Sequence, residues 1–214
     1  GGTAGTLAAL SGNVINYAKL VFNRSDAVAY SGAFSGTGSL FVEPGDLTLS
    51  GVASYTGLTR LTSTSTPNTI TYSNNVPPST SGFAGKGVVV IQPATGASFT
   101  SVFTPSYTYA SSLTGLTLGH SSNTQTMNIG SAISIAGPIK AYGGTVAANY
   151  NLTSTLTTGL GISLNGTKIT QAAGTTVSTP GSNIEYIVSN SGFTSGDDIG
   201  MYLGATGSTA TLNA

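Results

Sequence analysis

Cysteine and tryptophan are both absent from this chain of 214 residues. The lack of cysteine excludes a disulfide framework and any thiolate metal site. Charged residues make up only 6% of the chain, against about a quarter in an ordinary globular domain. The six basic and six acidic residues give a net charge of zero and are scattered singly. Nucleic acid is therefore not expected as a partner, because it would require a basic patch.

Long apolar runs are also missing. Runs such as Val88 to Ile91 are far shorter than the ~20 apolar residues of a membrane helix. They are typical of buried strands, and we expect no membrane insertion by this segment.

Hydrophobic residues nevertheless make up 39% of the chain, and glycine accounts for 30 residues. Disordered chains are usually poor in aliphatic residues and rich in charge, so this composition argues against disorder. The polar positions are filled mainly by Ser and Thr. These residues suit stacked strands, because Thr is β-branched and short hydroxyl or amide side chains can bond to a neighbouring strand.

The stretch from Tyr30 to Thr59 has the clearest pattern in the chain. Leu40 and Val42 alternate with more polar neighbours, and so do Leu47 and Leu49, which is the period of two expected when one face of a strand is buried. Gly and Pro residues fall between these short segments, where the chain must turn. The pattern predicts short strands joined by tight turns, although a hairpin meander would turn as often.

The order of residues over Leu20 to Leu40 and Pro44 to Thr59 resembles the autotransporter-associated β-strand repeat. The shared markers are Phe22, Asn23, Tyr30, Gly32, Ser35 to Leu40, Gly45, Leu47, Leu49, Gly51, Tyr55 and Gly57. The family occurs in secreted passengers of Gram-negative bacteria. The resemblance implies an all-β fold, a right-handed parallel β-helix (β-solenoid), displayed at the cell surface.

A second region, Leu116 to Thr170, is similar to repeats of filamentous-haemagglutinin-type surface adhesins. Its markers include the runs LTLG, SAISIAGPI and YGGTV, which end at Gly119, Ile139 and Val146. Between the two regions, Thr62 to Gly87 is rich in Pro, Asn, Ser and Thr, and we expect a projecting loop or insertion there, with a short strand at Ile70 and Tyr72.

Pairs of apolar residues predict the inward positions of the second half. They are Leu116/Leu118, Met127/Ile129, Ile133/Ile135, Ile139/Ala141, Val146/Ala148, Ile162/Leu164 and Ile184/Tyr186/Val188. Their spacing indicates coils of about 20 residues, hence about ten coils and a rod of roughly 45 to 50 Å. We expect residues 1–214 to form a single solenoid segment of a longer protein. Residues 193–214 would form an end cap or one more coil.

No residue pattern indicates catalysis, a cofactor or a metal. His120 is the one histidine, so any triad or zinc site would depend on it, but no carboxylate is near it in sequence, and we expect an exposed turn. Asp197 and Asp198 are the only adjacent carboxylates, and a Ca²⁺ site needs more oxygen ligands than these two provide. Glu43 and Asp46 flank a Pro-Gly turn and are expected at a solvated corner.

Asparagine and tyrosine residues are expected to have structural roles. Asn74, Asn75, Asn149, Asn151 and Asn165 lie at predicted turns and could stack between coils. Three glycosylation patterns begin at Asn23, Asn151 and Asn165, and such short patterns arise easily by chance in a Ser/Thr-rich chain. Tyr30, Tyr55 and Tyr142 are expected to be stacking partners within the solenoid rather than platforms for a sugar.

The sequence therefore predicts a non-enzymatic segment of an exported bacterial surface protein, located extracellularly and acting as a stiff stalk or adhesive surface. Host-cell or matrix surfaces, glycans, its own copies and neighbouring coils of the parent protein are the expected partners. Two functional alternatives stay open: a subunit of a self-assembling filament and a polysaccharide-processing β-helix enzyme. A β-sandwich adhesin is the alternative fold, but its strands should be longer and less punctuated by glycine.

Overall fold

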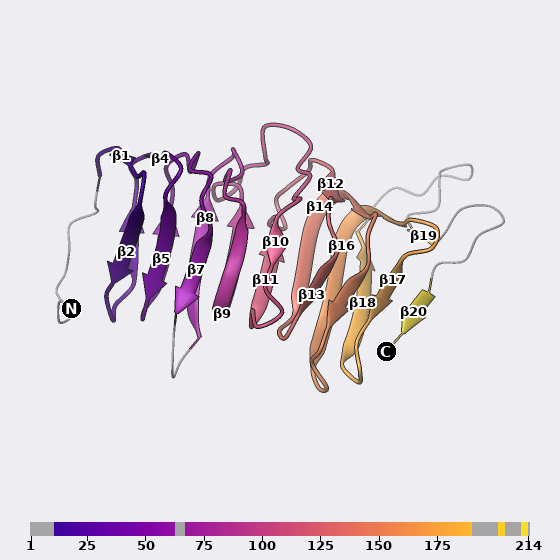
Figure 1. The fold of residues 1–214 in the computed structure, drawn as a ribbon. Coiled ribbons are helices and arrows are strands. Elements are labelled where there is room, and N and C mark those ends of the chain that lie inside the picture. The colour runs from indigo at the N-terminus through magenta and orange to yellow at the C-terminus, as the bar shows by residue number, and fades with distance from the viewer. Residues whose placement is uncertain (1–10, 63–66, 190–200, 204–210, 214) are drawn as a thin grey trace.

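The structure, a computed structural model, describes residues 11–62, 67–189, 201–203 and 211–213. Within these ranges all regular elements are β-strands, and the strands pair in parallel to form a β-solenoid of about eight turns. Figure 1 shows the coils stacked side by side, from β2 near the N-terminal end to β18 and β20 near the C-terminal end. The all-β parallel solenoid predicted from the sequence is thus confirmed, with fewer coils than the ten expected.

One sheet face passes through every coil of the stack. It contains β3 (Val28–Tyr30), β6 (Leu47–Leu49), β8 (Asn68–Ser73), the second half of β9 (Gly82–Gln92), β11 (Gly115–Leu118), β14 (Ile139–Ala148), β16 (Leu160–Gln171) and β18 (Asn183–Val188). The register is continuous except for a bulge at Leu160/Ile162 in β16, so the other paired positions of one strand stand above their counterparts in the next coil.

The other faces each pass through part of the stack. The first half of β9 continues a sheet of β2 (Lys19–Asn23), β5 (Ser39–Glu43), β7 (Thr59–Thr62) and β10 (Thr108–Tyr109). The second halves of β14 and β16 pair with β12 (Met127–Ile129) and β19 (Met201–Leu203). The remaining strands are β1 (Val14–Ile15) with β4 (Phe34–Ser35), and β13 (Ile133–Ile135), β15 (Leu152–Ser154), β17 (Thr176–Ser178) and β20 (Thr211–Asn213).

The coils are unequal in length, which explains why there are fewer than predicted. Val28 pairs with Leu47, a step of 19 residues, whereas Val89 pairs with Leu116, a step of 27. The longer coil has extra turns between Pro93 and Ser112 that the apolar pairs do not reveal. At ~4.8 Å per coil, eight coils span roughly 38 Å rather than the expected 45 to 50 Å.

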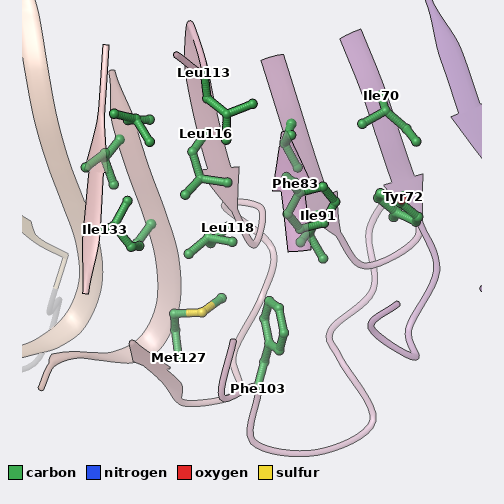
Figure 2. Close-up of a cluster of buried hydrophobic side chains, with 14 of the residues drawn as sticks. Ile70, Tyr72, Phe83, Ile91, Phe103, Leu113, Leu116, Leu118, Met127 and Ile133 are labelled. Carbon is green, nitrogen blue, oxygen red and sulfur yellow. The ribbon is translucent and has the colours of Figure 1, made fainter. Parts of the chain in front are cut away.

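The core is a ladder of apolar side chains that repeats from coil to coil (Figure 2). One inward column contains Val28, Leu47, Ile70, Val89, Leu116, Ile139, Ile162 and Ile184. The inward pairs predicted from the sequence are confirmed as buried up to β16. In β18 the three predicted side chains are only half-buried but still pack against the core.

The prediction of a projecting loop over Thr62 to Gly87 is wrong for the residues that the structure describes. Strand β8 is built into the sheet between β6 and β9, and its Ile70 and Tyr72 are buried, which confirms the short strand expected there. The Asn residues after β8 do mark a turn, but it is a corner of the coil. Asn74 Nδ2 donates to Ser50 O in the preceding coil at 2.8 Å.

Most of residues 193–214 lie outside the described residues. Within this range, β19 and β20 pair in parallel with β16 and β17. The described ranges contain no helix long and apolar enough to cross a membrane.

Candidate functional site

The main surface hollow near His120 lies on the outer side of the sheet face that runs through all coils. It has a volume of about 350 Å³ and is called here the Gly119 hollow. Strands β9, β11 and β14, together with the turn after β11, provide its walls. Its lining residues are Val90, Gln92, Thr117, Gly119, His120, Ser121, Lys140 and Tyr142.

A missing side chain creates this hollow. Ile91, Leu118 and Ala141 are register partners in three successive coils. The next outward position of each coil is therefore Gln92, Gly119 and Tyr142, and the middle one has no side chain.

Glycine is required at this position by the backbone. Gly119 has a φ of 81°, and its N–H donates to Ile91 O at 2.7 Å. A Cβ atom added at Gly119 would lie 2.2 Å from Tyr142 O. The gap between Gln92 and Tyr142 is therefore a fixed feature of the coil and not a flexible opening.

His120 is held at the rim of the hollow by its own turn. The Ser122 N–H donates to His120 Nδ1 at 3.2 Å, and Ser122 Oγ donates to Ala97 O at 2.8 Å. Because Nδ1 accepts this hydrogen bond, the neutral ring carries its N–H at Nε2. Ser122 Oγ also lies 3.1 Å from His120 Nδ1, and no carboxylate is among the residues that line the hollow.

Three polar side chains of the hollow have no hydrogen-bond or ion-pair partner in the part of the chain that the structure describes. They are the amide of Gln92, the ammonium group of Lys140 and the hydroxyl of Tyr142, and each side chain is half-buried. The hollow therefore presents two groups that can both donate and accept hydrogen bonds, those of Gln92 and Tyr142, together with the positive charge of Lys140. The sequence did not predict this grouping, because it depends on how coils of different length come into register.

The acidic corner around Glu43 and Asp46 is tied into the fold. Asp46 is exposed, and its Oδ1 accepts a hydrogen bond from Thr69 N in the next coil at 2.7 Å. Nearby, Arg24 forms an ion pair with Asp26 at 2.6 Å, and this hydrogen bond lowers the pKa of the carboxyl. In the described residues, no group of three or more His, Asp or Glu side chains is placed to hold a metal ion.

The other residues singled out from the sequence are distributed around the solenoid. Asp197 and Asp198 lie outside the described residues. Asn75 and Asn151 each accept a backbone N–H of a neighbouring coil, from Ala94 and Thr176, so their side chains link successive coils.

Two of the predicted stacking tyrosines are internal. Tyr30 packs against Phe34, with ring centroids 4.6 Å apart, and Tyr55 is 1% exposed. Tyr142 instead faces outward into the Gly119 hollow.

A buried hydroxyl network was missed from the sequence. Tyr55, Thr59, Tyr72 and Thr80 are joined by hydrogen bonds, with the Tyr55 hydroxyl 2.6 Å from Thr59 Oγ1 and also bonded to the hydroxyl of Tyr72. Burial raises the pKa of Tyr55 to about 12 and raises the pKa of Tyr72 well above its usual value. The available signal was Thr59, a polar residue in register with the inward Leu40.

Comparisons with family models, with curated proteins and with solved structures find no match for this chain. The two repeat resemblances therefore stay predictions, and a function must be argued from the solenoid and its surface.

Proposed function

We propose that this chain is a non-enzymatic segment of an exported bacterial surface protein, in which the solenoid acts as a stiff stalk with an adhesive outer surface. The observation that carries the proposal is the parallel pairing that runs from β3 to β18, with one bulge at Leu160/Ile162 in β16. The resemblance of two regions of the sequence to repeats of bacterial surface proteins supports a location outside the cell.

Stiffness follows from the way in which the coils are joined. Each coil bonds its backbone to the next through several strands, and the apolar ladder fills the interior between them. Bending would separate strands on one side and would break hydrogen bonds and core contacts together. Such a rod needs neither disulfides nor metal ions, which suits a chain without cysteine.

Adhesion is supported by the outer surface. The outward column of the continuous face consists of Ala29, Thr48, Thr71, Val90, Thr117, Lys140, Ser163 and Glu185, of which Ser163 is buried. Most are short side chains, so this face is fairly flat and can meet an extended partner. The Gly119 hollow lies beside this column.

The test uses the purified chain attached to beads. The beads are applied under flow to epithelial cells and to immobilised extracellular-matrix proteins, and retention is compared with that of beads carrying the heat-unfolded chain. The proposal predicts saturable retention that the free folded chain competes away. In parallel, single-molecule pulling along the stack should give unfolding forces typical of a mechanically resistant fold.

Retention equal to the unfolded control on every surface would contradict the adhesive role. Unfolding at forces indistinguishable from those of a flexible linker would contradict the stalk role. The two arms are separate, so one role can fail while the other stands.

A further inference from the structure

We propose that the Gly119 hollow binds a sugar residue that carries a carboxylate, such as a uronic acid or a sialic acid, at the end of a glycan chain. The inference rests on the adhesive role proposed above and gives it a site and a ligand class. It starts from the gap between Gln92 and Tyr142 and from the unpaired groups around it.

The charge of the hollow favours an anion. Lys140 has no ion-pair partner in the described ranges, and the lining residues include no carboxylate. Glu185 lies in the same outward column, but Ser163 stands between it and Lys140. Two strand spacings, roughly 9.6 Å, therefore separate the two backbones. A ligand carboxylate at Lys140 would gain a charge-assisted hydrogen bond, which is stronger than a neutral one.

The size and the other groups of the hollow favour a sugar over a small inorganic anion. A volume of about 350 Å³ is at the lower end of ligand pockets, which run from about 300 to 1,000 Å³. Gln92 and Thr117 can each donate and accept hydrogen bonds, as ring hydroxyls require. The ring of Tyr142 offers an apolar face and a polar tip to the same ligand.

The backbone positions of the donor residues are fixed before a ligand arrives. Lys140 and Tyr142 project from β14, and Gln92 projects from β9, on strands whose register is fixed by the ladder. The hydrogen bond from Ser122 N to His120 Nδ1 leaves Nε2–H of the neutral ring as a further donor at the rim. Because the strands do not move, binding has to order only side-chain rotamers, which limits the entropic cost.

The experiment measures binding by NMR and by calorimetry, using the whole chain at low salt. The probes are N-acetylneuraminic acid and galacturonic acid, with galactose as the neutral sugar and sodium sulfate as the anion without a sugar ring. Binding of an acidic sugar should perturb the amide signals of Gly119, His120 and Tyr142, and galactose should bind at least about tenfold more weakly, the loss expected for one charge-assisted contact.

Two variants locate the site. Lys140→Gln keeps the length of the side chain and removes the charge, and it should weaken binding of the acidic sugar about tenfold. Lys86→Gln is the matched control, because Lys86 is an exposed lysine of β9 outside the hollow, and its affinity should equal that of the parent chain. Tyr142→Leu should weaken the acidic sugar and galactose by a similar factor. Circular dichroism and thermal melting confirm that each variant is folded.

Several outcomes would overturn the inference. These are equal affinity in the parent chain and in Lys140→Gln, sulfate binding as tightly as the acidic sugars, and no perturbed amides near Gly119. If beads that carry Lys140→Gln are still retained on cells, the adhesive role stands and this site is excluded as its cause. Loss of retention for the parent chain itself would instead remove the adhesive role.

Discussion

At the scale of single residues, the interior of this solenoid is less uniform than its apolar ladder suggests. Thr59 lies in register with Leu40 and Phe83, and it places a hydroxyl where the neighbouring coils have apolar side chains. The hydroxyl is satisfied because Tyr55, Tyr72 and Thr80 converge on it. Sequence periodicity identified inward aliphatic residues well, but it cannot show which tyrosines from different coils will meet.

This network predicts a loss of stability at alkaline pH. The folded pKa of Tyr55 is about 12, above the usual value of 10.0, and that of Tyr72 is raised well above 10.0, both because burial disfavours the phenolate. Stability from a raised pKa is complete below pH 10 and is lost as the pH rises through the folded pKa, since the unfolded chain releases its protons first. Each buried tyrosine should remove about 1.4 kcal/mol between pH 9 and pH 11.

Urea unfolding at pH 9, 10 and 11 measures this loss. Tyr55→Phe is the comparison, because it removes one titrating group and keeps the ring, and its free energy of unfolding should fall less steeply with pH. Parallel pH profiles for the parent chain and the variant would contradict the assignment of the loss to Tyr55.

At the scale of elements, the strands are predictable from the sequence, whereas the corners of the coils are not. Alternation of apolar and polar residues predicted β5, β6, β11, β12 and β13 correctly. The Pro and Asn residues around β8 predict a projecting loop, whereas in the structure they mark corners on either side of a buried strand. Turn residues have the same composition in both settings, so pairing with β6 and β9 was needed to distinguish them.

Two substitutions in β8 test its place in the sheet. Ile70 is fully buried and Thr71 faces outward. Ile70→Ala should lower the free energy of unfolding by about 2 to 5 kcal/mol, because it leaves a cavity in the ladder. Thr71→Ala should change it by less than about 0.5 kcal/mol. Equal, small effects in chemical denaturation would mean that β8 does not contribute to the core.

The bend of β9 depends on one glycine. Gly85 has a φ of 91° and lies near the end of the part of β9 that pairs with β7, two residues before the pairing with β8 begins at Gly87, and an added Cβ would lie 1.8 Å from Leu61 O. Gly96 has a φ of 76° with nothing within 4 Å of its added Cβ. Alanine at Gly96 should cost about 1 kcal/mol from backbone strain alone.

Alanine at Gly85 should cost at least about 2 kcal/mol more than alanine at Gly96, because the strand of the adjacent coil must also move. Thermal and chemical denaturation of the two variants gives the difference. Equal costs would show that the two coils do not approach each other closely at this bend.

At the scale of the whole molecule, the register of the coils links fold to function. The same ladder that makes the rod stiff brings Gln92, Gly119 and Tyr142 into one row, although 50 residues separate the first from the last. The sequence predicted the solenoid but not this row. Coil lengths of 27 and 23 residues at this point could not be read from the apolar pairs, and a different length would place another residue opposite the gap.

The measurement that tests the parallel stack most directly is a set of distances between spin labels. Since the chain has no cysteine, single cysteine pairs can be introduced cleanly at outward positions. The pairs are Thr48→Cys with Lys140→Cys, four coils apart, and Thr48→Cys with Glu185→Cys, six coils apart. At ~4.8 Å per coil, the backbone separations are roughly 19 Å and 29 Å.

The stack predicts that the second distance exceeds the first by about 10 Å, with a narrow distribution for both pairs. Equal distances, or broad distributions that overlap, would contradict the parallel solenoid and every functional proposal that depends on it.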